Sequence, residues 1–130
     1  MKNTTYFAAG LLLPILIGAT QRTSAQDPVK LAPKNVKVRF ENYRVRVLEV
    51  RIQPGEKIPM HSHPAHLTYT FTDFKGKYTS PDGQGTVGEA KHDNLYWSEA
   101  ITHASENTGT TEIHALVIEL KEPPKRPKEK

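Results

Sequence analysis

Apolar and polar residues alternate with a period of two through most of the chain after residue 35. The segments 35–40 and 43–52 (NVKVRF and YRVRVLEVRI) exchange β-branched and basic residues at successive positions, which is typical of half-buried antiparallel strands. Two more strands are predicted in 66–79, joined at 73–76, and a final strand in 110–120 has the near-continuous apolar run of a core position. Convincing helical spacing is absent from the sequence. The pattern therefore predicts an all-β protein.

Turn residues divide this region into about eight or nine short strands, each bounded by Gly, Pro, Asn or Asp, as at 81–83. So many turns in one small domain favour a sandwich or a small antiparallel β-barrel, in which sheet closure hides strand edges. We expect one domain at 35–120, preceded by a linker at 26–34. A charged, Pro-rich tail at 121–130 is expected to be solvated.

The first 25 residues have the pattern of a signal peptide. Lys2 supplies a positive charge, an apolar run extends from Tyr6 to Ala19, and residues 23–25 are of the kind that signal peptidase requires. An uncleaved membrane anchor is the alternative, although a spanning helix needs about 20 apolar residues. We therefore expect an exported protein, periplasmic or secreted, whose mature chain begins near Gln26 and has no membrane partner.

Charge and cysteine content narrow the functional classes. The formal net charge of the 130 residues is +4, and without Lys2 and Arg22 there remain 16 basic against 14 acidic residues, so no nucleic-acid surface is implied. The chain has no cysteine. Its stability must then come from packing, from a bound metal or from oligomerisation, and a homodimer formed through an edge strand is compatible with a small barrel.

Three histidines occur within six positions in PMHSHPAHLTYTF, residues 59–71. On a strand, His61 and His63 project to the same side, as two ligands of one ion must. His103, in SEAITHASEN, is the candidate third ligand. Neutral imidazoles suit divalent transition metals, and the sequence does not distinguish Fe, Zn, Ni, Cu or Mn. A polar turn that is rich in histidine is the alternative interpretation.

The spacing of these residues resembles the cupin superfamily. Gly55, five residues and then His61-Ser62-His63 is similar to the first cupin motif, and His103 followed by Asn107 is similar to the end of the second. The resemblance extends over about 36–120 and is closest to small single-domain bacterial cupins. It implies a double-stranded β-helix with one metal ion in the mouth of the barrel, bound by His61, His63 and His103.

The chain also departs from the cupin pattern. Leu67 and Thr68 stand where the family usually has a glutamate ligand, and the Pro-x-Gly before the last histidine is absent. Some dioxygenases of the superfamily, including cysteine dioxygenase and acetylacetone-cleaving enzymes, hold iron with three histidines alone. His66 has the wrong parity on a regular strand, but a bulge at Pro64 would make it a fourth ligand, and otherwise it lies at the rim or supports a ligand.

Further residues are candidates for the pocket wall: Tyr69, Phe71, Trp97 and Glu99. For the three aromatic residues the alternative is packing in the core, and for Glu99 it is solvent. His114, in the last strand, is expected to be satisfied by a backbone or water partner rather than to bind a metal. There is no Ser-His-Asp spacing and no phosphate-binding glycine loop.

Three functions remain. The first is a metal-dependent dioxygenase or isomerase acting on a small anionic or chelating substrate, with His66 or Glu99 moving a proton. The second is a non-enzymatic protein that captures a metal or small ligand, and the third is a scaffold without a site.

Overall fold

The computed structural model describes residues 26–122, which form nine strands and one short helix. The predicted signal peptide (1–25) and most of the predicted tail (123–130) lie outside the described residues, so the export prediction stays a prediction. The elements are α1 (Pro28–Leu31), β1 (Val36–Glu41), β2 (Val45–Ile52), β3 (Lys57–His63), β4 (His66–Thr70), β5 (Phe74–Thr79), β6 (Gly85–Ala90), β7 (Asn94–Ser98), β8 (Ile101–Asn107) and β9 (Ile113–Leu120). The all-β prediction is confirmed.

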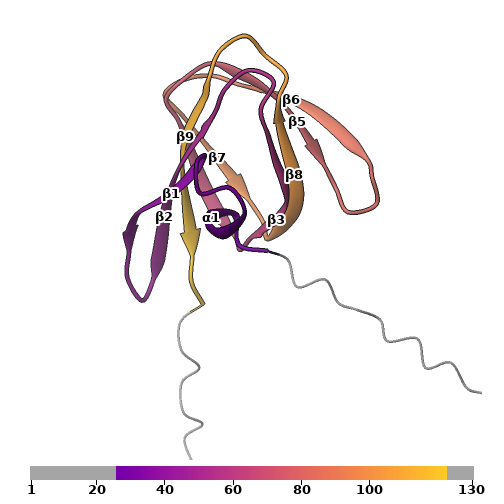
Figure 1. Ribbon diagram of the computed structural model, residues 1–130. Coiled ribbons are helices and arrows are strands. Elements are labelled where there is room, and N and C mark those ends of the chain that lie inside the picture. Colours follow the sequence, from indigo (N-terminus) through magenta and orange to yellow (C-terminus); the bar gives the residue numbers. More distant parts are fainter. Residues whose placement is uncertain (1–25, 123–130) are drawn as a thin grey trace, which may run out of the picture.

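The strands form two antiparallel sheets that face each other. The five-stranded sheet has the order β1-β2-β9-β4-β7, and the four-stranded sheet has the order β3-β8-β5-β6. Only β1–β2 and β5–β6 are hairpins within one sheet, and every other connection carries the chain to the opposite sheet. In Figure 1, β3 and β8 form one wall and β1, β2 and β9 the facing wall. This winding is the double-stranded β-helix that the resemblance to cupins implies.

Apolar side chains from both sheets pack around the inner cavity described below. On β2 the inward residues include Leu48 and Ile52, whereas Val45 and Val47 have the opposite parity and lie on the outer face. The buried apolar cluster consists of Ala32, Val36, Leu48, Ile52, Ile58, Ile113 and Val117. Because Leu48 is completely buried, truncation to alanine would cost about 2–5 kcal/mol.

The expected linker at 26–34 is wrong for its central part, which forms α1. The Asp27 carboxylate caps this helix by accepting a hydrogen bond from the Val29 amide at 3.0 Å, and Pro28 occupies the first turn. Pro28 and Ala32 are buried, and α1 lies between the two walls at one end of the barrel (Figure 1). A helix of four residues is too short to show periodicity, so the pattern of the sequence missed it.

The turn expected at 73–76 is also displaced. Strand β4 ends at Thr70 and β5 begins at Phe74, so Gly76 lies within β5. A Cβ at Gly76 would lie 3.0 Å from the Tyr78 hydroxyl oxygen. The glycine thus makes room for the Tyr78 side chain rather than forming a turn.

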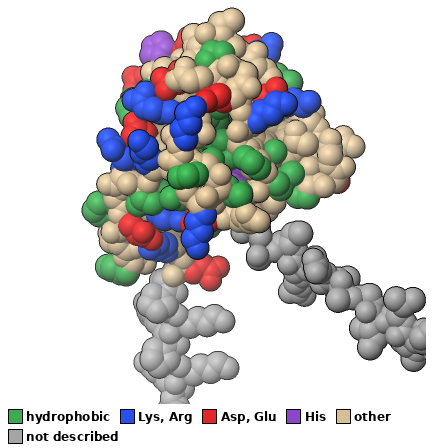
Figure 2. Space-filling view, viewed as in Figure 1, with side chains coloured by type: hydrophobic (Ala, Val, Ile, Leu, Met, Phe, Trp, Pro, Cys, Tyr) green, Lys and Arg blue, Asp and Glu red, His purple; other side chains and the backbone are tan. Residues whose placement is uncertain are grey.

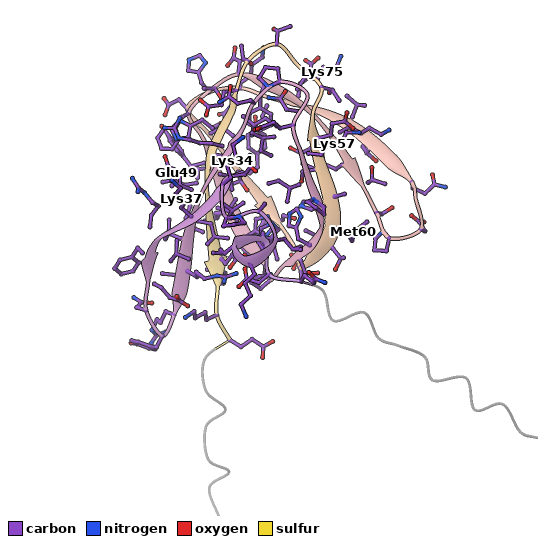
Figure 3. The ribbon with its side chains drawn as sticks, viewed as in Figure 1. Lys34, Lys37, Glu49, Lys57, Met60 and Lys75 are labelled. Atoms are coloured by element: carbon purple, nitrogen blue, oxygen red, sulfur yellow. The ribbon has the colours of Figure 1, made fainter. Side chains whose placement is uncertain are left out.

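The surface carries charges of both signs. Figure 2 shows basic and acidic side chains interspersed over one face, and the lysines labelled in Figure 3 are spread over several elements. Glu49 on β2 accepts from Arg39 at 3.1 Å and from Arg51 at 3.3 Å, which gives local pairs rather than a field of one sign. Within residues 26–122, no helix is long and apolar enough to cross a membrane.

Candidate metal centre

Three histidines converge between the sheets from neighbouring strands. His61 and His63 lie on β3, and His103 lies directly opposite His61 on β8. One ligand nitrogen from each ring can be chosen so that all three lie within 4.8 Å of one another. Nitrogens bound to a metal at 2.0–2.1 Å stand about 3–3.5 Å apart, so this donor set is close to the spacing that one ion requires. The residues present therefore fit a divalent transition metal.

A β-bulge directs the two β3 histidines inward. Ile58 pairs with Ser105 and His61 pairs with His103, so β3 has one more residue than β8 over this interval. Pro59 lies within the bulge and lacks a backbone N–H to donate to the ladder. Met60 is 37% exposed on the outside (Figure 3), whereas Ile58 and His61 are both buried despite their opposite parity.

Hydrogen bonds at Nδ1 fix the orientation of His61 and His63. Nδ1 of His61 lies 2.7 Å from the carbonyl oxygen of Pro59, and this acceptor requires the proton to be on Nδ1. Nδ1 of His63 lies 2.7 Å from Oε1 of Glu119. Both rings therefore keep Nε2 as the free ligand atom, which is the arrangement that a metal-binding imidazole needs.

Glu119, on β9, is the functional residue that sequence reasoning missed. It is only 2% exposed, and its other oxygen accepts a hydrogen bond from Nε of Arg46 at 2.6 Å. Arg46 in turn donates to Asp27 at 2.8 Å. Burial alone raises the pKa of Glu119, but the hydrogen bonds from His63 and Arg46 outweigh it and lower the pKa, so the carboxylate is ionised. A buried acid inside an apolar strand was the available sequence signal.

Burial favours the neutral form of His61, His66 and His103. Desolvation lowers the pKa of His103 to about 3, with further lowering from the positive charge that His61, His63 and His66 would carry. Desolvation also lowers the pKa of His61 and of His66. Since only neutral imidazole binds a metal, the site is prepared for an ion at neutral pH.

His66 faces the same interior from the opposite sheet. The chain crosses between sheets at residues 64–65, so Pro64 marks the crossing and not the bulge considered from the sequence. The His66 ring is buried, and its centroid lies 5.1 Å from that of His63. Its Nδ1 lies 2.7 Å from the Pro64 carbonyl oxygen. The parity argument failed because it assumed one continuous strand. His66 is not a member of the three-histidine cluster.

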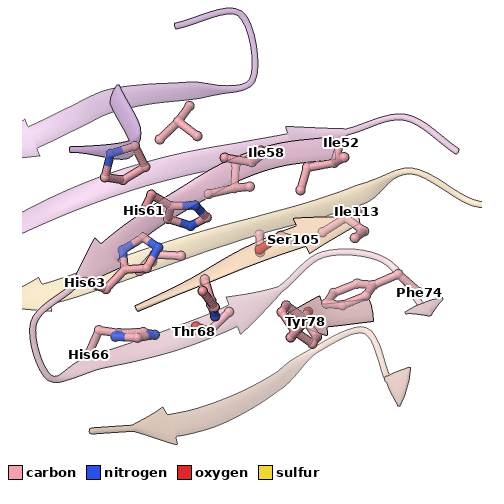
Figure 4. A pocket seen from close by; sticks show the side chains of 16 residues that line it. Ile52, Ile58, His61, His63, His66, Thr68, Phe74, Tyr78, Ser105 and Ile113 are labelled. Carbon is pink, nitrogen blue, oxygen red and sulfur yellow. The ribbon is translucent and has the colours of Figure 1, made fainter. Parts of the chain in front are cut away.

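Two cavities meet at the histidines. The inner cavity, of about 90 Å³, is lined by all four imidazoles, and Figure 4 shows His61, His63 and His66 toward one end of it. The outer cavity, of about 480 Å³, shares His66, Thr68, Phe74, Tyr78 and His103 with it. Thr68 occupies one of the positions where cupins usually carry the glutamate ligand, so a hydroxyl faces the site there. Among the lining residues of the outer cavity, Glu89 is the only carboxylate and no lysine or arginine occurs.

The predicted pocket residues are not part of this site. Tyr69 and Phe71 point away from the interior: the Tyr69 hydroxyl donates to Asp93, and Phe71 is 43% exposed. Inward positions on β4 are instead His66, Thr68 and Thr70, because the strand begins again after the crossing.

Trp97 and Glu99 are likewise outside both cavities. Trp97 is 53% exposed, and its Nε1 donates to Glu99 Oε1 at 2.7 Å. Tyr96 and Ser98, of the opposite parity on β7, line the outer cavity instead. The pocket assignments of Tyr69, Phe71, Trp97 and Glu99 are therefore wrong.

Two further polar residues lie outside the lining of both cavities. His114 is on the outer face with Nε2 2.9 Å from Glu49 Oε1, so its partner is a carboxylate side chain and not the backbone or water that the sequence predicts. Asn107 is buried at the end of β8, where its amide nitrogen donates to the carbonyls of Ile52 and Thr111 and its side-chain oxygen accepts from Gly109. Asn107 thereby ties together the loops beyond the site.

Comparisons with known proteins give matches at the level of structure. No protein-family model and no curated protein matches the sequence. A cupin domain from Bordetella pertussis superposes with a TM-score of 0.62 and 26% identity, over 67% of this chain and 92% of that one. A cupin family protein with a double-stranded β-helix fold from Methanocaldococcus jannaschii gives a TM-score of 0.54 and 14% identity, over 66% and 78%. A cupin superfamily protein from Desulfitobacterium hafniense gives 0.51 and 17%, over 67% and 76%.

The fold, the histidine cluster and these matches lead to one class. The chain is a small cupin, and its fold is one that supports metal binding. The resemblance carried by the two histidine motifs is thus confirmed. The relatives share the fold with this chain, and they leave its reaction and ligand to be argued from its own residues.

Proposed function

We propose that this protein is a metal-dependent cupin enzyme of the dioxygenase or isomerase kind, acting on a small chelating molecule that carries a negative charge. One observation carries the proposal: the convergence of His61, His63 and His103 in a buried site that opens on a larger cavity. His61, His63 and His103 would hold one divalent transition metal ion through imidazole nitrogens. Such an ion supplies Lewis-acid polarisation and open positions for a ligand.

The charges around the histidine cluster favour a ligand that carries a single negative charge. The three ligands are neutral, and the outer cavity has no lysine or arginine in its lining, so a second anionic group would have no lysine or arginine to pair with. Glu119, ionised behind His63, partly offsets the charge of a divalent ion. An enolised diketone, a thiol acid or a hydroxy acid has the chelating groups and the single charge that match this balance.

The outer cavity suits a small organic molecule. Its volume of about 480 Å³ is within the range of roughly 300–1,000 Å³ that small-molecule sites occupy. Tyr78, Phe74 and Tyr96 supply aromatic surface, and hydroxyl groups supply hydrogen bonds without charge; the hydroxyl residues are Thr68, Thr70, Ser80, Thr86, Ser98 and Thr102. These groups would orient the substrate and exclude water.

His66 is the group best situated to move a proton. It lines both cavities, and its Nδ1 is occupied by the Pro64 carbonyl, which leaves Nε2 as an acceptor. Desolvation holds its pKa below the usual value, so it is neutral and able to accept a proton at neutral pH. Glu99 has no such role, because it is bound to Trp97 outside the cavities.

A non-enzymatic cupin that captures a metal or small ligand is the second candidate. The observation that favours it is the scarcity of acid–base groups: beyond the histidines and tyrosines, Glu89 is the only ionisable residue lining the two cavities. Capture needs the ligands and the cavity but no proton transfer.

Metal analysis of the untagged protein tests the proposal. We expect about one transition metal ion per chain, and loss of that metal in His103→Ala, with Ala104→Leu on the same strand as a control for disturbance of β8. Oxygen consumption or product formation with a panel of diketones, thiol acids and hydroxy acids supports the enzyme.

The same panel separates the alternatives. Stoichiometric zinc or copper with no turnover of any substrate supports the binding protein. If the untagged protein, after incubation with iron, zinc, nickel, copper or manganese, retains none of them, both proposals are wrong and a scaffold remains.

A further inference from the structure

The inner cavity has two chemically different ends. Along β9 the inward residues run from Ile113 through Ala115 and Val117 to Glu119, so three apolar positions precede the carboxylate behind His63. At about 3.3 Å per residue, Ile113 and Val117, which both line the cavity, stand roughly 13 Å apart along β9. Figure 4 shows His61, His63 and His66 toward one end and Ile52, Ile113 and Phe74 toward the other. The metal ligands therefore occupy only part of the cavity.

Aliphatic and aromatic side chains make up the second end. Ile52 and Ile113 are paired across β2 and β9, Ile58 comes from β3, and Phe74 comes from the start of β5. Ile52, Ile58 and Ile113 are each less than 5% exposed. The hydroxyl residues Ser105 and Tyr78 border this end. The name "apolar chamber" is used below for the part lined by Ile52, Ile58, Phe74, Ile113 and Ala115.

We propose that the apolar chamber is a binding site for a small uncharged apolar molecule of the size of dioxygen. A buried water needs two to four polar partners, and the chamber walls offer few, so an apolar guest replaces water at little cost. The inner cavity, at about 90 Å³, is smaller than the engineered apolar cavity of about 150 Å³ that binds benzene or xenon. A guest of one or two heavy atoms fits this volume better than a ring does.

The position of the chamber suggests its use. It lies in the same cavity as the histidines, whereas the larger outer cavity is lined by hydroxyl groups that suit a polar molecule. A dioxygenase would then receive its two reactants from different sides of the histidine cluster. This use rests on the proposed function, but binding of the apolar guest requires neither metal nor substrate.

Xenon, monatomic and apolar, is the probe. The full chain is labelled at the δ1 methyl groups of isoleucine, and methyl spectra are recorded at increasing xenon pressure, with and without zinc. Saturable shifts are expected at Ile52, Ile58 and Ile113. Two other isoleucines within residues 26–122 are internal controls: Ile101, 40% exposed, borders the outer cavity, and Ile118 points outward from β9.

A filling variant tests the location. Ala115→Leu extends a side chain into the chamber and is expected to lower xenon affinity at least tenfold while metal content stays unchanged. Ala104→Leu makes the same replacement on β8, outside the lining of both cavities, and is expected to leave xenon binding intact. If Ala115→Leu does not fold, the wild-type methyl spectra decide the matter. Equal, non-saturating shifts at the five isoleucines of residues 26–122, or no shifts at them, overturn the proposal.

The two proposals fail in different ways. Saturable xenon binding in a protein that retains no metal leaves the chamber in place and removes the metal enzyme. One bound metal ion per chain without xenon binding leaves the metal site in place and removes the apolar chamber as a binding site. A xenon shift that is unchanged in Ala115→Leu contradicts the assigned position.

Discussion

Nδ1 of His63 and Oε1 of Glu119 lie 2.7 Å apart although 56 positions separate the two residues in the sequence. Arg46 holds the other carboxylate oxygen at 2.6 Å, so Glu119 cannot easily turn away. The pair fixes the His63 ring with Nε2 toward the other histidines and makes the imidazole a stronger donor to a metal.

Glu119→Gln should therefore weaken metal binding. Glutamine keeps the shape of the side chain but removes the charge and faces Arg46 with an uncharged group. We expect zinc affinity to fall by about 10–100-fold, as is typical when a partner of a metal-binding histidine is removed. Zinc titration against a competing chelator measures this change.

Glu106→Gln is the matched control for that experiment. Glu106 lies on β8 and pairs with Lys57 at 3.6 Å on the exposed surface, so its charge should not influence the site. The absorption spectrum of bound Co²⁺ should change in Glu119→Gln and remain the same in Glu106→Gln. Wild-type zinc affinity in a correctly folded Glu119→Gln protein would contradict the role assigned to Glu119.

His66→Ala and His103→Ala should differ in their effect on metal binding. His103 belongs to the three-nitrogen cluster, whereas His66 does not. We expect His103→Ala to lower zinc affinity more than about 100-fold, beyond the range of a supporting residue, and His66→Ala to lower it less than about tenfold. Similar losses in both variants would make His66 a fourth ligand.

The metal-free protein should lose stability as the pH falls below about 6.5. An unfolded histidine titrates near pH 6.5, whereas desolvation lowers the pKa of His103 in the folded protein to about 3. Between these values the unfolded state binds more protons, so the free energy of unfolding decreases with falling pH, by about 1.4 kcal/mol per pH unit for this residue. The lowered pKa values of His61 and His66 act in the same direction.

Urea unfolding at pH 7.5, 6.0 and 5.0 measures this dependence. His103→Gln removes one titrating group and should flatten the slope relative to the wild-type protein. Replacement of His92 is the control, because that histidine is exposed and bound to Asp73 on the surface. Equal slopes in wild type and His103→Gln would show that His103 is not held neutral.

The strands and two of the three histidines of the site could be predicted because they depend on local spacing, which by itself indicates only a sandwich or barrel. Alternation with a period of two produced the strands, and the two-residue interval between His61 and His63 was enough to put both rings on one side of β3. The position of His103 came from resemblance to the cupin motifs, since nothing local in 98–107 shows which strand β8 pairs with.

The surroundings of the site depend on tertiary features that the spacing of residues along the sequence does not show. The chain crosses between sheets at Pro64, which reverses the parity in β4 and turns Tyr69 and Phe71 outward. Glu119 was missed because His63, its hydrogen-bond partner, is distant in the sequence. A single acidic residue near the end of an apolar strand is also easily taken for the point where the strand leaves the core. The helix cap at Asp27 was missed because a helix of four residues is too short to produce a recognisable periodic pattern of apolar residues.

Asp27 links the N-terminal helix to the metal site, and two substitutions can separate its two roles. Asp27→Asn keeps an oxygen for the Val29 amide but removes the charge opposite Arg46, and a partly exposed ion pair of this kind contributes at most about 1 kcal/mol. Asp27→Ala also removes the cap, at a further cost of about 1 kcal/mol. Urea unfolding should rank the free energies of unfolding as wild type, Asn, Ala.

Zinc affinity provides the second measurement on the same proteins. Because Arg46 contacts both Asp27 and Glu119, loss of the Asp27 charge lets Arg46 interact more strongly with Glu119, so both variants should shift zinc affinity alike although their stabilities differ. Asp82→Asn, in the exposed turn between β5 and β6, is the control and should change neither quantity appreciably. Equal stability of Asp27→Asn and Asp27→Ala would mean that the cap contributes nothing. A zinc affinity that follows stability rather than charge would mean that Asp27 acts only by holding α1 in place.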